Sequence, residues 1–295
     1  MLSGLSLTKE ESWLEIWRNV LKHSPQKTRV INNEKELVER WNKRAKNFTN
    51  NSNTKDKSLV RATVIDKLKE SGILRKGIHV LDIGAGIGNY SLPISKIADT
   101  VVALEPASEM VNILRNRING DKIKNIKVMD KRWQEINLQK EQMVKQFDLV
   151  FASMTPGIQE PKDILKMNDA SREACYLSTQ SGQRWQFAEE LWNYFFDEPM
   201  GDNPRDIIYP FGLIYSMGYQ PEMFSLPMRA SFRQSKEIIA EKLIWYFSNY
   251  LDITLEKEKI IKQYVENNLH KLKESSNNRH ASSAMIWWVH KPEVK

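Results

Sequence analysis

Three glycines at alternate positions lie between a strand-like run and a helical run. The stretch from 80 to 90 reads VLDIGAGIGNY, with Gly84, Gly86 and Gly88 following Asp82. Glycine adopts positive φ without a steric cost, and it lets backbone N–H groups come close to a ligand. A loop at the carboxyl end of a strand lies where open α/β sheets bind their ligands. The residue types and their spacing therefore predict a cofactor-binding loop.

An acidic residue ends the next strand-like run. Glu105 follows Gly84 by 21 residues, a position from which a carboxylate can accept hydrogen bonds from both hydroxyls of a ribose. The dinucleotide fingerprint G-x-G-x-x-G requires glycine where this chain has Asn89, so a nicotinamide dinucleotide is excluded. An acid at position 82 suits a cationic amino-acid group better than a pyrophosphate.

The chain resembles the class I S-adenosylmethionine-dependent methyltransferases. The resemblance is carried by VLDIGAGIG, by VVALEP at 101–106, by FDLVFAS at 147–153 and by the upstream helix WNKRAKNF at 41–48. It covers about residues 41 to 180, and it extends to 291 if the last two strands close the sheet. It implies a Rossmann-like α/β fold, a seven-stranded, mostly parallel sheet with helices on both faces. It also implies S-adenosylmethionine as the cofactor.

The resemblance implies a role for each residue of the cofactor site. Asp82 and the glycines would line the methionine part, Glu105 would bind the ribose and Pro106 would touch the adenine. The acid that usually follows the third strand would fall at Lys131 or Arg132, which leaves Asp130 or Trp133 for the adenine. The cofactor-binding residues implied in this way are Trp41, Asp82, Gly84, Ala85, Gly86, Gly88, Asn89, Glu105, Pro106, Arg132, Trp133, Ser153 and Met154.

The acceptor side is expected after the fourth strand, at Ser153-Met154-Thr155-Pro156. A sulfonium methyl needs little activation, so the main task is to align donor and acceptor, and no catalytic base is identified. The tyrosines among the candidates serve either substrate contact or core packing. One cysteine and five scattered histidines do not have the spacing of a metal site. The acceptor-side candidates are Thr155, Asn168, Tyr209, Tyr215 and Tyr219.

The elements that must position these residues follow from hydrophobic periodicity. Strand-like runs alternate with helical runs from 79 to 180, which predicts a parallel sheet covered on both faces. One of those helical runs is 134–145. We divide the chain into an N-terminal helical extension or lid at 1–58, ending in a polar linker at 48–58, and a methyltransferase domain at 59–295. A helical insertion at about 234–275 precedes the last strand at 283–291.

Charge bears on the choice of acceptor. The chain carries 44 Lys and Arg against 37 Asp and Glu, a net charge of +7 with a pI of about 9.2. The stretch 151–230, which would build the acceptor side, has a net charge of −5. This favours methyl transfer to a small or medium-sized molecule, and nucleic acid is not expected as a partner. Two alternatives are kept: an RNA methyltransferase, and a non-catalytic protein that binds the cofactor.

Further expectations concern the surroundings of the protein. The single cysteine, Cys175, fits a reducing cytoplasm, and no apolar run reaches the ~20 residues that span a bilayer. Trp13 and Trp17 of the first helix serve either core packing or a homodimer surface. Trp41 and Arg44 either close over the cofactor or dock their helix on the sheet.

Overall fold

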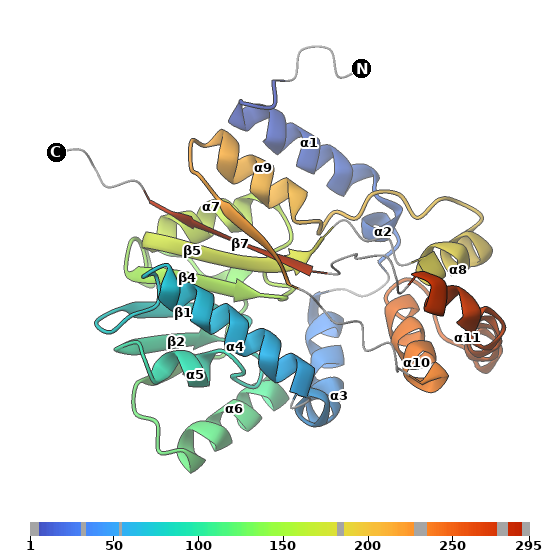
Figure 1. Ribbon diagram of the computed structural model, residues 1–295, viewed down its shortest axis with the longest axis horizontal. Coiled ribbons are helices and arrows are strands. Elements are labelled where there is room, and N and C mark those ends of the chain that lie inside the picture. The colour runs from blue at the N-terminus through green and yellow to red at the C-terminus, as the bar shows by residue number, and fades with distance from the viewer. Residues whose placement is uncertain are drawn as a thin grey trace.

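A twisted seven-stranded sheet forms the centre of the computed structural model (Figure 1). The structure describes residues 6–30, 34–52, 55–181, 186–226, 235–275 and 283–290. The strand order is β3-β2-β1-β4-β5-β7-β6, and β7 is antiparallel to both of its neighbours. The strands are β1 (His79–Ile83), β2 (Thr100–Leu104), β3 (Ile126–Met129), β4 (Phe147–Ser153), β5 (Ser171–Gln180), β6 (Glu222–Leu226) and β7 (Ser283–Val289). The predicted Rossmann-like sheet is confirmed.

Helices cover both faces because the central strands are apolar on both sides. The helices α4 (Lys55–Glu70), α5 (Ser91–Ser95) and α6 (Ser108–Gly120) pack on one face. The helices α7 (Pro161–Ala170), α9 (Ile208–Ser216) and α1 (Glu10–His23) pack on the other. A short helix, α2 (Pro25–Thr28), follows α1. Because β1 to β5 are parallel, their carboxyl ends lie at one edge of the sheet.

A second hydrophobic core lies beyond that edge. The helices α8 (Gln186–Phe196), α10 (Lys236–Phe247) and α11 (Leu255–Ser275) enclose Trp192, Leu243 and Phe247, which are fully buried. In Figure 1 these helices stand apart from the sheet, and α3 (Glu34–Ser52) lies between them and the strands. The predicted insertion at about 234–275 therefore packs against α8, which comes from an earlier part of the chain.

Two local predictions were wrong. The run 134–145 is not a helix: a single 3-10 turn (Trp133–Glu135) is followed by turns, and Gln142 and Lys145 have positive φ. Ile136 and Leu138 both point into the core, an alternation that a helix cannot provide. The polar stretch 48–58 is helical over 48–52 and 55–58, because α3 continues to Ser52 and α4 begins at Lys55.

Candidate active site

The glycine-rich loop crosses the carboxyl end of β1. Gly84 has a φ of +72°, and a Cβ there would lie 1.9 Å from Thr155 Oγ1. Gly86 has a φ of +56°, yet nothing lies within 4 Å of its Cβ position. Gly84 is therefore required by the contact with Thr155, whereas Gly86 exposes its backbone to open space. That open space is where a bound molecule could approach the chain.

Glu105 is held against this loop. One carboxylate oxygen accepts a hydrogen bond from the Gly86 N–H at 2.8 Å, and the other accepts one from the Ala107 N–H at 2.9 Å. Only 7% of the residue is exposed, and burial raises the pKa of this carboxyl in spite of the two hydrogen bonds. Each carboxylate oxygen has a further lone pair, so Glu105 can still accept a hydrogen bond from a ligand.

Asp82 is a second buried acid at the same edge. It lies on β1, and its carboxylate accepts a hydrogen bond from the Ser91 hydroxyl at 2.5 Å. Burial raises the pKa of Asp82 to about 7, and the charge of Glu105 adds to the rise. A buried carboxylate of this kind is stabilised by a cation, which would restore its ordinary pKa.

The helix α3 covers the loop. Ala45 is buried with Ile87 and Ala107, so α3 packs directly on the glycine-rich loop and on the start of α6. The side-chain oxygen of Asn42 accepts a hydrogen bond from the Glu109 N–H at 3.0 Å. Asn42 therefore caps the first turn of α6 from another helix, which fixes α3 above the site.

The turn after β4 forms the other side of the site. The Ser153 and Ser178 hydroxyls lie 2.9 Å apart, and the Met154 N–H donates to the carbonyl of Ser178 at 2.9 Å. Met154 has a φ of +48°, and 54% of the residue is exposed. The Thr155 hydroxyl oxygen accepts a hydrogen bond from the Gly157 N–H at 3.0 Å. The turn therefore holds an apolar side chain outward from a rigid backbone.

The end of β3 differs from the prediction. Trp133 is buried in the core, where its indole N–H donates to the carbonyl of Asp163 at 3.3 Å. Its ring is therefore not an open surface for an adenine, and that part of the prediction was wrong. Asp130 lies exposed just after β3 and pairs with Arg115 at 2.9 Å. Arg132 lies close to Glu135.

Comparison with known proteins points to one group of enzymes. Residues 45–189 match the family model described as ribosomal RNA adenine dimethylase. A protein of Methanosphaera stadtmanae named as a ribosomal RNA small subunit methyltransferase A is 27% identical over 131 residues, 44% of this chain and 44% of that protein. The ribosomal RNA small subunit methyltransferase A of Clostridioides difficile is 25% identical over 105 residues, 36% of this chain and 34% of that protein. The matched part spans less than half of each relative.

Solved structures agree on the fold. The YcgJ protein of Bacillus subtilis superposes with a TM-score of 0.52 at 12% identity, over 79% of this chain and 98% of that one. A protein of Galdieria sulphuraria assigned as a sarcosine dimethylglycine methyltransferase has a TM-score of 0.51 at 14% identity, over 78% of this chain and 84% of that one. The chain belongs to the class I S-adenosylmethionine-dependent methyltransferases. Its cofactor is S-adenosylmethionine.

One expectation for this methyltransferase is overturned by its relatives. Nucleic acid was not expected as a partner, because the stretch 151–230 is acidic. The matching family model and both relatives are named for ribosomal RNA. The argument from charge was wrong because it assumed that one continuous stretch of sequence builds the acceptor side. In the fold, helices from three other parts of the chain also border the carboxyl edge.

Three of the acceptor-side candidates lie at the wrong edge of the methyltransferase sheet. Asn168 is near the end of α7, where it accepts a hydrogen bond from the Trp288 indole at 3.2 Å and donates to the Tyr219 hydroxyl at 3.0 Å. Tyr215 lies in the last turn of α9 and is exposed. Both helices run away from the carboxyl edge, so Asn168, Tyr215 and Tyr219 lie near the strand amino ends.

Tyr209 has a structural role. It is 8% exposed and stacks on Trp17 with ring centroids 6.1 Å apart, so it fixes α9 to α1. Thr155 alone of the five candidates lies beside the glycine-rich loop. Of the cofactor residues, Asp82, Glu105 and the loop from Gly84 to Asn89 are brought together at this edge, with Trp41 on the covering helix.

Sequence reasoning missed two residues that organise the site. Ser91 bonds to Asp82, and a serine in the first turn of the helix after the loop was a signal that could have indicated it. Asn42 caps α6, but it lies 67 positions from Glu109 and had no local signal. The contact exists only because α3 folds across the edge.

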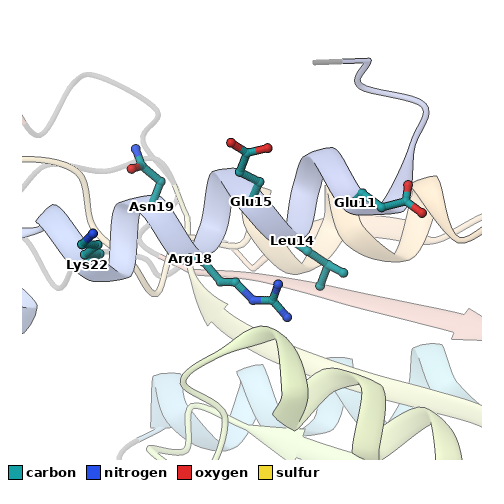
Figure 2. Close-up of a pocket in the computed structure, with 6 residues that line it drawn as sticks. All are labelled: Glu11, Leu14, Glu15, Arg18, Asn19 and Lys22. Carbon is teal, nitrogen blue, oxygen red and sulfur yellow. The ribbon is translucent and has the colours of Figure 1, made fainter. Parts of the chain in front are cut away.

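The helix α1 does not take part in this site. Figure 2 shows the residues that line a pocket beside α1, and all six of them come from this helix. Trp13 and Trp17 lie against α9, so these tryptophans pack within the chain. Among the described helices, none has the length and apolar character that crossing a membrane requires. The residues lining the pocket are Glu11, Leu14, Glu15, Arg18, Asn19 and Lys22.

Proposed function

We propose that this methyltransferase transfers the methyl group of S-adenosylmethionine to RNA, with an adenine of ribosomal RNA as the first acceptor to test. The observation that carries the proposal is the family match over residues 45–189. That range contains the glycine-rich loop, both buried acids and the turn after β4.

The residues at the carboxyl edge fit the cofactor. Gly86 leaves a backbone surface that a Cβ would fill, and Glu105 keeps a free lone pair beside it. We assign Glu105 to the ribose hydroxyls and Asp82 to the cationic amino-acid end. When bound, S-adenosylmethionine supplies a methyl carbon on a positively charged sulfur. Asp82 is well suited to that end because its carboxyl would lose its proton beside a cation.

The turn after β4 would orient the acceptor. Its backbone is held by the bonds of Ser153 and Met154 to Ser178, so its position is rigid. The exposed Met154 thioether can pack on the face or edge of a base. Orientation of the two reactants can contribute roughly 7–11 kcal/mol to a transfer of this kind. We therefore assign this turn to positioning of the base and not to proton transfer.

Transfer of labelled methyl groups tests the proposal directly. The full chain is incubated with methyl-labelled S-adenosylmethionine and unmodified small-subunit ribosomal RNA, free and assembled with ribosomal proteins. We expect label in methylated adenosine after digestion to nucleosides. The variant Glu105→Ala should lose the activity, and Glu173→Ala, at the opposite edge, should keep it.

Other outcomes of this assay would contradict the proposal. Label recovered only in small molecules of a cell extract would mean that the acceptor is a metabolite and not RNA. Label that never leaves the cofactor, although the demethylated cofactor raises the melting temperature, would indicate a non-catalytic binding protein.

A further inference from the structure

Five basic side chains from three helices lie near enough for their charges to act on neighbours within the set. Arg40 and Arg44 come from α3, Lys57 and Arg61 from the start of α4, and Lys242 from α10. We call these five residues the basic seam. Figure 1 shows α3 with the start of α4 on one side and α10 on the other. The seam therefore joins two parts of the chain that are almost two hundred residues apart in sequence.

The side chains of the seam are close enough to repel one another. The pKa of Arg40 is lowered by burial and by the charge of Arg44. Burial and the charges of Arg44 and Arg61 lower the pKa of Lys57. Burial and the charges of Lys57 and Arg44 lower the pKa of Lys242. Holding like charges together costs stability, and structural features of this kind are expected at sites that bind an oppositely charged ligand.

Two of the arginines are held in fixed positions. The Arg40 guanidinium donates to Asn249 Oδ1 at 2.6 Å, to Ser248 Oγ at 2.8 Å and to the carbonyl of Trp245 at 3.2 Å. The Arg44 guanidinium lies 4.1 Å from the centre of the Trp245 ring. Neutral groups and an aromatic face thus orient these cations, and their charges stay available to an anion.

An aromatic surface lies within the seam. Trp245 is 38% exposed, and its ring meets Trp41 edge-on with centroids 6.0 Å apart. Proteins that bind single-stranded nucleic acid combine a basic groove for the backbone with aromatic side chains on which bases stack. The seam has both features, which a site for a small inorganic anion does not need.

The seam borders the cofactor edge. Arg44 directly precedes Ala45, which packs on Ile87 of the glycine-rich loop. Arg61 acts on the pKa of Tyr90, which ends the same loop. A polymer that lay along the seam would therefore pass close to the place where the methyl group is transferred.

We propose that the basic seam binds the phosphodiester backbone of the RNA acceptor, with the exposed part of the Trp245 ring as a contact for a base beside it. This inference rests on the proposed function, since it names the surface that receives the RNA. It also explains how a chain with an acidic acceptor stretch binds a polyanion: the cations come from α3, α4 and α10.

The test measures RNA binding as a function of salt. The probe is a fluorescein-labelled single-stranded RNA of about 20 nucleotides, long enough for several contacts. The double variant Lys57→Ala/Lys242→Ala removes two charges of the seam. We expect its affinity to fall roughly tenfold or more at ~0.1 M salt, and the slope of log affinity against log salt to become shallower by about 1.4.

A matched control removes the same charge elsewhere. Lys96 and Lys124 are exposed near the amino ends of the strands, so Lys96→Ala/Lys124→Ala should leave RNA affinity within about twofold of the wild type. Affinity for the demethylated cofactor, measured by calorimetry, should be unchanged in both double variants. Melting curves of both double variants check that each is folded.

The outcomes separate the inference from the proposed function. Equal RNA affinity in the seam variant and the wild type would contradict RNA binding by the basic seam, but it would not contradict RNA methylation. Loss of cofactor affinity in the seam variant would assign these cations to the cofactor carboxylate instead. Saturable binding of inorganic phosphate that displaces the RNA at constant ionic strength would indicate a small-anion site. Absence of RNA binding by the wild type at low salt would contradict the proposed function itself.

Discussion

Acidic side chains lie at both edges of the sheet, but their surroundings differ. At the amino edge, Asp148 accepts hydrogen bonds from Arg172 at 2.6 Å and from the His79 N–H at 2.7 Å. Burial alone would raise the pKa of Asp148, but these bonds and the charge of Arg172 hold it below its ordinary value. At the carboxyl edge, burial prevails, and the pKa values of Asp82 and Glu105 are raised.

This difference separates an acid whose charge is compensated within the chain from acids on which burial prevails. An acid whose charge is compensated within the chain stabilises the fold and has little to offer a ligand. Asp82 and Glu105 accept hydrogen bonds from a hydroxyl and from backbone N–H groups, which are neutral donors, so a bound cation would stabilise their charged forms. Matched variants inside and outside the carboxyl edge test this difference.

The largest loss of stability is expected when a glycine of the glycine-rich loop is replaced by alanine. Gly84→Ala combines left-handed strain of about 1–2 kcal/mol with overpacking against Thr155 of about 1–3 kcal/mol. Gly72→Ala, at the end of α4, meets the same strain with nothing within 4 Å. Thermal unfolding should show the larger loss for Gly84→Ala, together with loss of stabilisation by the demethylated cofactor. Equal losses in the two variants would contradict the contact with Thr155.

The contributions of the acids at the two edges to the stability of the fold should change with pH in opposite directions. The unfolded chain ionises Asp82 near its ordinary pKa of 3.8, but the folded chain does so only near about 7. The neutral carboxyl therefore favours the folded state below this window, and stability is lost as pH rises through it, by a few kcal/mol. Asp82→Asn should remove that slope.

Asp148 provides the matched case for that pH experiment. Its folded pKa is lowered, so its contribution to stability is present above its ordinary pKa and is lost as pH falls through the lower, folded value. Asp148→Asn should therefore flatten the acid side of the stability profile. Chemical denaturation at a series of pH values measures the free energy of unfolding of both variants and the wild type. Contributions of Asp82 and Asp148 that change with pH in the same direction would contradict the comparison.

Removal of one carboxylate should separate ligand binding from stability. Glu105→Ala should weaken binding of the demethylated cofactor by about 1.5–3 kcal/mol, or roughly 10- to 150-fold, through lost charge-assisted hydrogen bonds. Glu173→Ala breaks an exposed ion pair with Arg75 at 2.7 Å and should leave that affinity unchanged. Isothermal calorimetry measures both. Unchanged affinity in Glu105→Ala would mean that the ribose is held elsewhere.

The smallest effect concerns two strained residues. Met154 and Gln142 have φ values of +48° and +54°, so glycine at either position should stabilise the chain by about 1 kcal/mol. Only Met154→Gly should slow methyl transfer to RNA, by up to roughly tenfold, because it removes an apolar contact for the base. Paired melting and transfer assays test this. Slower transfer by Gln142→Gly would assign the effect to backbone freedom in general.

Much of the cofactor half could be predicted from the sequence because its signals are local. Gly84, Gly86 and Glu105 lie at strand ends, so the strand–helix alternation already brings them to one edge. The acceptor half could not be predicted in this way. Asn168 and Tyr219 follow the correct strands in sequence, but each is placed at the far end of a helix. Periodicity predicts that a helix exists, but not which of its ends reaches the site.

The sequence by itself determined the alternation of strands and helices, the glycine-rich loop and the identity of the cofactor, because each depends on local periodicity or on a motif. Only the tertiary structure decided that α3 covers the loop, that Asn42 caps α6 and that cations of three helices form the basic seam. Those features depend on packing between segments far apart in the chain. The position of charges on the surface depends on which helix faces pack together. Composition and net charge do not determine that packing.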